Sequence, residues 1–183
     1  MKEPRIFLNL SDNPPPEIVL SKEQAHHLTH VLRLKSGAAL TLVSKSSGQV
    51  FAAELVCNHN DTRACLKGLL PVTRETGCVD TLLFAASKGV KNDLVCEKAS
   101  ELGVRRIIFW EASRSVIKVR ESHAKLSRLE RVAQAACAQS GKNYVTKLHL
   151  APSLEEALQI LDNDSVGSHD KLYCSFEDEA AYV

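Results

Sequence analysis

The feature that most constrains this chain is a change of pattern near residue 75. Before it, four short segments rich in apolar and β-branched residues surround one helical segment, and after it strands and helices alternate. Short strands joined by turns favour a compact β-module, whereas alternation is typical of a parallel sheet with helices on its faces. The sequence therefore predicts two domains, residues 1–72 and residues 78–183, with the boundary within 71–79.

The first domain is predicted to be a small β-barrel built around one helix. The three prolines of Asn13–Pro16 cannot join a strand ladder and predict a loop. Ser21 and Gln24 have the spacing of a capping box, which predicts a helix that runs to Leu34. The predicted strands are Arg5–Leu10, Ala39–Val43, Gln49–Val56 and Thr62–Leu70.

The second domain is predicted to be α/β. Gly103 stands where a helix commonly ends in a left-handed residue, with the apolar Val104 after it. The predicted strands are 81–86, 105–110, 147–150 and 171–175, and the predicted helices are 93–102, 123–140 and 153–161. A parallel sheet needs both faces covered, and few residues follow 171–175. Either the domain is small or its fold continues beyond this chain, and the second interpretation is favoured.

Charge is distributed unevenly along the chain, although the total is only +1. Residues 76–150 hold 13 basic and 7 acidic side chains, whereas residues 151–183 hold 1 basic and 8 acidic. Local positive charge attracts polyanions, so this pattern is compatible with nucleic-acid binding. A solvated helix face followed by an acidic tail explains it equally well.

The sequence has neither a membrane-spanning stretch nor a secretory signal, which predicts a soluble, cytoplasmic protein. Cys57 and Cys65 allow a disulfide across a turn, but reduced thiols are favoured in that compartment. His26 and His30 lie at i, i+4 on one helix face. A metalloprotease pair would need Glu at position 27 and a third ligand, so no metal site is predicted.

Basic residues follow two consecutive strands of the predicted parallel sheet. Lys88 and Lys91 come after the first strand, and Arg114 and Lys118 after the second. Loops at the carboxyl ends of parallel strands meet at one edge, where ligands commonly bind. The first loop is not a glycine-rich nucleotide fingerprint, but its lysines and the helix start after it could hold a phosphate. A solvated loop is the equally weighted alternative.

Several segments, taken in order, resemble the signatures of one family. They are Arg5-Ile6-Phe7, the HLTHVLRL run His27–Leu34, Lys88-Gly89 with Lys91, the EKASELGV run Glu97–Val104, Arg114-Ser115-Val116 and the ACAQS run Ala136–Ser140. Together they resemble the RsmE-type 16S rRNA uridine-N3 methyltransferases of the SPOUT superfamily. The resemblance runs along nearly the whole chain.

The resemblance implies a PUA-like RNA-binding barrel followed by a SPOUT-type α/β domain, which binds S-adenosylmethionine in a trefoil knot and forms homodimers. It implies 16S rRNA or the small ribosomal subunit as partner. Arg114 and Lys88 become the candidate catalytic residues. The candidate RNA-binding residues are Arg5, Arg33, Lys35, Lys91, Lys118, Gln139, Lys142 and Asn143. Lys142 departs from the arginine that is common in the family, which weakens bidentate contacts.

The family's cofactor loops, of the type GPEGG and LG-x-R-x-LR-x-ET, have no counterpart in this sequence. They are expected C-terminal to Val183, so the SPOUT-type domain is predicted to be truncated here and no cofactor-binding residue is assigned. Two alternatives stay open beside the methyltransferase. One is a catalytically inactive RNA-binding protein that uses the barrel and the basic edge. The other is an unrelated α/β protein whose basic face is only solvated.

Overall fold

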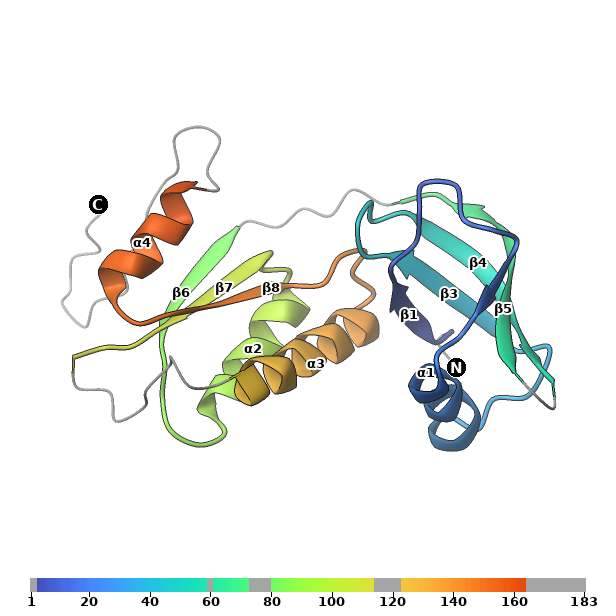
Figure 1. The fold of residues 1–183 in the computed structure, drawn as a ribbon, viewed down its shortest axis with the longest axis horizontal. Helices are drawn as coiled ribbons and strands as arrows, with labels where there is room; N and C mark the ends of the chain where they lie inside the picture. Colours follow the sequence, from blue (N-terminus) through green and yellow to red (C-terminus); the bar gives the residue numbers. More distant parts are fainter. Residues whose placement is uncertain (1–2, 59–60, 73–79, 114–122, 164–183) are drawn as a thin grey trace.

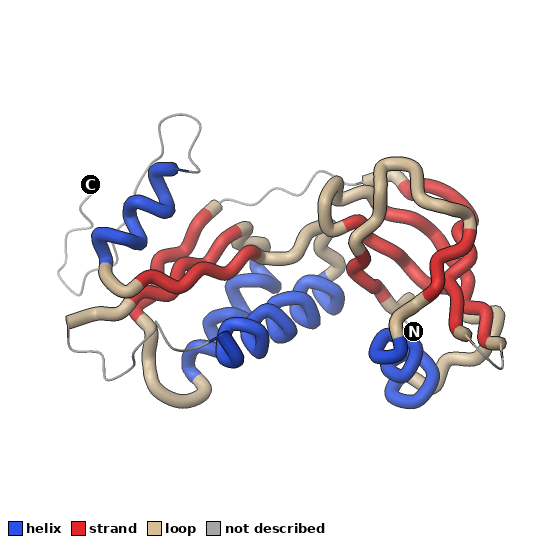
Figure 2. Tube along the Cα trace, viewed as in Figure 1, coloured by secondary structure: helices blue, strands red, loops and turns tan. Residues whose placement is uncertain are grey.

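The computed structural model describes residues 3–58, 61–72, 80–113 and 123–163. These residues form two lobes side by side along the long axis, an N-terminal β-domain and a C-terminal α/β domain (Figure 1, Figure 2). The predicted strand 171–175 and most of the predicted domain boundary lie outside the described residues.

The N-terminal domain is one curled five-stranded sheet in the order β1-β3-β4-β5-β2. β1 (Arg5–Leu8) runs parallel to β3 (Ala39–Ser44), and the other pairs are antiparallel. β4 (Val50–Cys57) and β5 (Thr62–Leu70) agree closely with the predicted strands. Alternation along the strands buries one face around a core that Leu28 of the helical segment completes.

The capping box at Ser21 begins a shorter α-helix than the sequence predicts. Ser21 Oγ accepts from the Gln24 amide at 3.2 Å, and Gln24 Oε1 accepts from the Ser21 amide at 2.9 Å. This helix, α1 (Lys22–His26), passes directly into the π-helical turn η1 (His27–Val31). The predicted continuous helix to Leu34 is therefore wrong in its second half, because the backbone widens by one residue per turn there.

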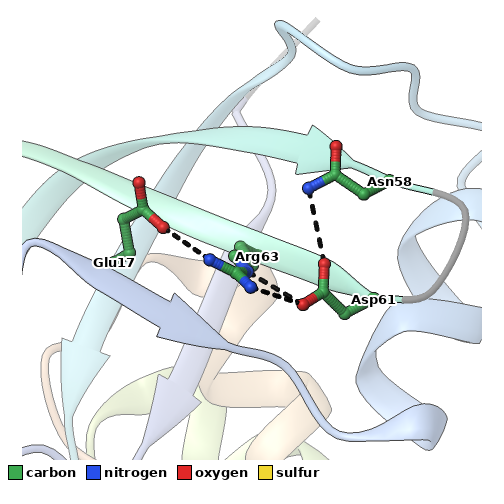
Figure 3. A network of polar contacts seen from close by, with 4 residues as sticks. All are labelled: Glu17, Asn58, Asp61 and Arg63. Carbon is green, nitrogen blue, oxygen red and sulfur yellow. Dashed lines mark hydrogen bonds and ion pairs between the residues drawn. The ribbon is translucent and has the colours of Figure 1, made fainter.

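Strand β2 (Glu17–Val19), which the sequence analysis did not predict, pairs with the edge of β5. Arg63 of β5 links the two strands by donating to Glu17 at 2.9 Å and to Asp61 at 2.7 Å (Figure 3). Hydrogen bonding to the Arg63 guanidinium lowers the pKa of Asp61, and the two carboxylates raise the pKa of Arg63. Ion pairs with this much solvent access contribute little to stability, so β2 is held mainly by its backbone pairing with β5.

Within the described residues, the C-terminal domain has three parallel strands in the order β6-β7-β8: Thr81–Ala85, Arg106–Trp110 and Lys147–Ala151. Helices α2 (Lys91–Leu102) and α3 (His123–Ser140) join them and pack on one face of the sheet. α4 (Leu154–Asn163) packs on the other face against β7 and β8. The alternation read from the sequence is thus confirmed for the described residues.

Gly103 ends α2 as predicted. Its φ is +95°, and the amide of Val104 donates to the Ala99 carbonyl at 3.0 Å, which closes the helix with a Schellman-type bond. A Cβ at position 103 would come within 2.9 Å of Lys142 Nζ. The left-handed backbone conformation therefore favours glycine here, whereas the flexible Lys142 side chain could move away from a Cβ.

The two domains share a small apolar cluster. Phe7, Val43 and Val50 of the β-domain pack with Cys137 near the end of α3, and all four are buried. Beside this cluster, Arg5 Nη1 donates to the Lys142 carbonyl at 3.0 Å and to Asn143 Oδ1 at 2.7 Å. The start of β1 is therefore joined to the segment that follows α3.

The four cysteines in the described residues carry free thiols. Cys57 lies opposite Thr62 and Cys65 lies opposite Glu54, so the two thiols of the hairpin do not face each other across the ladder. Burial raises the pKa of the Cys96 thiol to about 12.

Candidate functional site

The carboxyl edge of the parallel sheet, where β6, β7 and β8 end, carries two of the candidate residues. Lys88 lies in the loop after β6 and Lys91 is the first residue of α2, and both are exposed. The described carboxyl ends of β6, β7 and β8 lie at the end of the domain that points away from the β-domain (Figure 1). Arg114 and Lys118, predicted for the same edge, lie outside the described residues.

Asn92 holds the Lys88 loop in place. Its side chain is 1% exposed. Its Oδ1 accepts from the Ser87 amide at 2.9 Å and from Ser87 Oγ at 3.1 Å, and its Nδ2 donates to the Ser87 carbonyl at 2.7 Å. Three bonds to one residue fix the backbone just before Lys88, so Asn92 positions this loop.

A second group of candidates lies at the opposite end of the sheet. Gln139 lies in the last turn of α3, and Lys142 and Asn143 come just after this helix. The 18 residues of α3 span about 27 Å. These candidates lie next to the β-domain, where Arg5 bonds to the Lys142 carbonyl and to Asn143. The structure therefore does not bring these residues to Lys88 and Lys91. Their assignment to RNA binding stays a prediction.

Lys142 and Tyr144 pack around the end of α2. Lys142 Nζ lies beside Gly103, where the negative end of the helix dipole favours a cation. Tyr144 donates its hydroxyl hydrogen to the Gly103 carbonyl at 2.5 Å, and the Arg105 guanidinium carbon lies 5.0 Å from the centre of the Tyr144 ring. Thr146 Oγ1 donates to the Val104 carbonyl at 2.8 Å. This end of the sheet is held together by polar contacts between elements.

Arg33 has an uncommon backbone conformation. Its φ is +55°, in the left-handed region that favours glycine, and among the described residues it is the one non-glycine with a positive φ. The Leu34 amide donates to the Leu28 carbonyl at 2.9 Å, so the chain closes over the π-helical turn as it leaves it. Strain of this kind is concentrated at functional sites. Arg33 and Lys35 are both exposed on the β-domain, as an RNA contact would require.

A groove lies between the two domains. It has a volume of about 900 Å³. We call it the interdomain groove, and its lining includes Lys45 and Gly48 of the turn after β3, Arg131 of α3, and Asn143 and Lys147 beside and within β8. Sequence reasoning did not assign Lys45, Arg131 or Lys147 to any site. Their separation along the chain gave no local signal.

The described residues offer neither a cluster of metal ligands nor a membrane-spanning helix. Within them, no group of three or more His, Cys, Asp or Glu could hold a metal ion, and His26 and His30 instead stack with ring centres 4.6 Å apart. At the carboxyl edge the buried polar atoms of Asn92 are bonded to Ser87, so Asn92 shapes the loop after β6. Over the same ranges, no helix is both long and apolar enough to cross a bilayer.

The chain is thus a two-domain protein in which a mixed β-domain precedes a parallel α/β domain, with exposed lysines at the described carboxyl edge of the parallel sheet. Residues 75–181 match the family model described as the RNA methyltransferase domain, and residues 20–56 match the RNA methyltransferase PUA domain. The first match covers more than half of the chain. The chain therefore belongs to the RNA methyltransferase domain family, as the sequence motifs indicated.

Individual relatives agree with this assignment. The Ribosomal RNA small subunit methyltransferase E of Bacillus subtilis is 26% identical over 96% of this chain and 69% of its own length. Methyltransferase E 2 of Borreliella burgdorferi is 29% identical over 72% of this chain and 55% of its own length. The Neisseria gonorrhoeae methyltransferase E crystallised with S-adenosyl methionine has a TM-score of 0.78 at 25% identity, over 91% of this chain and 67% of that chain. This chain thus matches about 55–69% of these relatives' lengths.

Proposed function

We propose that this chain contributes to S-adenosylmethionine-dependent methylation of N3 of a uridine in 16S ribosomal RNA. The observation that carries the proposal is the order of the two family matches, a PUA domain and then an RNA methyltransferase domain, on a fold similar to that of a donor-bound relative. The partner is 16S rRNA or the small ribosomal subunit, in the cytoplasm. The proposal includes a homodimer, as the family resemblance implies.

Methyl transfer to uracil N3 requires loss of the N3 proton, which leaves negative charge on the base. Fixed cations near that charge stabilise the transition state more than the ground state. Lys88 is suited to this role because it is exposed at the carboxyl edge on a loop that Asn92 holds rigidly. Arg114 is the second candidate. S-adenosylmethionine supplies the methyl group when bound.

RNA contacts are assigned to the exposed cations of both domains. Lys91 and Lys118 would bind phosphate near the reacting base, and Arg33 and Lys35 would bind RNA on the β-domain. Such contacts position a strand without reading its sequence. The junction of the two domains would also contribute to RNA binding, through Arg5, Gln139, Lys142 and Asn143.

The test measures binding of 16S rRNA and transfer of a labelled methyl group by the same preparation. RNA binding together with transfer to uridine N3 confirms the activity. Lys88→Ala should reduce transfer without reducing stability. RNA binding with no uptake of S-adenosylmethionine in calorimetry selects the second candidate, an inactive RNA-binding protein. What supports that candidate is the match to the RNA methyltransferase PUA domain together with the exposed Arg33 and Lys35 of the β-domain.

A further inference from the structure

We propose that the interdomain groove is a second RNA-binding surface, which holds the sugar–phosphate backbone of an RNA strand independently of base sequence. The inference rests on the proposed function, because it takes an RNA substrate as given. It adds a surface at the end of the sheet opposite Lys88, formed by both domains. A volume of about 900 Å³ is large enough for a strand to lie between them.

The groove is strongly basic. Four cations line it and one carboxylate opposes them; the cations are Lys45, Arg105, Arg131 and Lys147, and the carboxylate is Glu130. Within the described ranges, neither Lys45, Arg131 nor Lys147 has a carboxylate within ion-pair distance. Arg105 reaches Asp80 only at 3.9 Å, with both side chains more than half exposed. Cations that the fold does not pair remain available to bind phosphate.

Both walls of the groove are fixed by contacts within the protein. On α3, Ser127, Arg131 and Gln134 recur at i, i+4 and i+7, beside the buried stripe that packs on the sheet. On the β-domain, Gly48 has a φ of +70°, and a Cβ there would lie 3.3 Å from the Asn143 carbonyl oxygen. The turn that carries Lys45 therefore packs against the other domain. Lys45 and Lys147 line the same groove.

The free edge of β8 adds backbone groups to the same wall. The Lys147 amide donates to the Arg105 carbonyl at 2.9 Å, toward β7. In a parallel strand, the next residue directs its N–H and C=O to the opposite side of the strand. Leu148 therefore directs these groups to the outer edge of β8. That edge has no strand partner in the described part of the chain. Backbone N–H groups near lysines and arginines are good phosphate donors.

The groove is suited to phosphate rather than to bases. The Tyr144 ring in its lining already has its hydroxyl bonded to Gly103 and the Arg105 guanidinium over the ring, and the other ring in the lining is the His149 imidazole. The other polar side chains are mainly short hydroxyls and cations, including Ser46 and Ser47. Such a surface positions a strand and specifies little sequence.

The experiment compares two triple variants of the chain. Lys45→Gln/Arg131→Gln/Lys147→Gln removes three exposed charges from the groove, and Lys22→Gln/Lys67→Gln/Lys98→Gln removes three exposed charges elsewhere. Binding to a 16S rRNA transcript and to oligouridylate is measured over a range of KCl concentrations. We expect the groove variant to reduce the slope of log affinity against log salt by about two, at roughly 0.7 per phosphate contact, on both RNAs.

Three results decide the outcome. Equal slopes for the groove variant and the control variant, with wild-type binding intact, would overturn the groove but leave the proposed function standing. No saturable RNA binding by the wild-type chain would overturn both. Loss of binding to one RNA and not the other would show base reading and overturn backbone binding. Unfolding midpoints of both variants close to wild type exclude misfolding as the cause of any loss.

Discussion

The two ends of the parallel sheet use similar residues for different purposes. At the end beside the β-domain, Arg5 and Asn143 bond to each other and Tyr144 bonds to the end of α2, so their polar atoms are used to join elements. At the carboxyl edge, Lys88 and Lys91 are exposed, and the polar side chain of Asn92 behind them is buried. A polar residue type is therefore no guide to its role until its partners are known.

The largest effect should come from the apolar cluster between the domains. Phe7 is 1% exposed and packs with Val43, Val50 and Cys137. Phe7→Ala should lower the free energy of unfolding by about 3–5 kcal/mol, because it removes buried surface and leaves a cavity. Urea unfolding measures this. Val90→Ala at the carboxyl edge, where Val90 is 75% exposed, is the control and should change stability by less than about 0.5 kcal/mol. Equal effects would erase the contrast between the two ends.

Arg5→Ala should have the next largest effect. It removes the charged donor to the Lys142 carbonyl and Asn143 Oδ1. Hydrogen bonds to charged groups contribute about 1.5–3 kcal/mol, so stability should fall by that amount. Arg5→Lys should recover part of it. The salt dependence of RNA binding then separates two roles. If Arg5→Ala reduces the slope of log affinity against log salt and Asn143→Ala does not, Arg5 contacts a phosphate directly. If neither variant changes this slope, Arg5 serves only to join the two domains.

Asn92→Ala should cost about 1–2 kcal/mol, because it leaves the buried polar groups of Ser87 without partners. Asn92→Asp sharpens the test. A protonated Asp can still donate to the Ser87 carbonyl, but a carboxylate cannot, and burial raises its folded pKa. Its stability should therefore be retained at low pH and lost as pH rises from about 4 through the folded pKa. A pH-independent difference from wild type would show that the Ser87 contact does not matter.

Much of the fold could be predicted because its signals are local. Gly103 with Val104, the capping box at Ser21 and Gln24, and the alternation after residue 80 each lie within a few residues, and each appears in the structure. The β2 strand was missed because Pro16 directly precedes it, and Arg63, 46 residues away from Glu17, holds it. The π-helical turn was missed because helical periodicity does not distinguish it from α-helix over five residues.

The candidate site was less predictable because its contacts join residues that lie far apart in the chain. Topology alone brought Lys88 and Lys91 to one edge, since loops after parallel strands meet there. The contact between Arg5 and Asn143 joins residues 138 apart in the chain, and no periodic pattern encodes it. The interdomain groove likewise combines a turn, a helix flank and an edge strand. Sequence motifs identified the family, but they did not separate residues that hold the domains together from residues that remain available to RNA.

The smallest effect on stability should come from the carboxyl-edge cations, and it completes the contrast. Lys88 and Lys91 are exposed, so replacing both with Ala should change the free energy of unfolding by less than about 0.5 kcal/mol. The salt-dependence slope of RNA binding should nevertheless fall by about 1.4, at roughly 0.7 per lost phosphate contact. Urea unfolding and filter binding in KCl measure the two quantities, with Lys98→Ala on the outer face of α2 as control. A stability loss as large as that of Arg5→Ala would mean that Lys88 and Lys91 have a structural role, and the carboxyl edge would then lose its assignment as an RNA-binding edge.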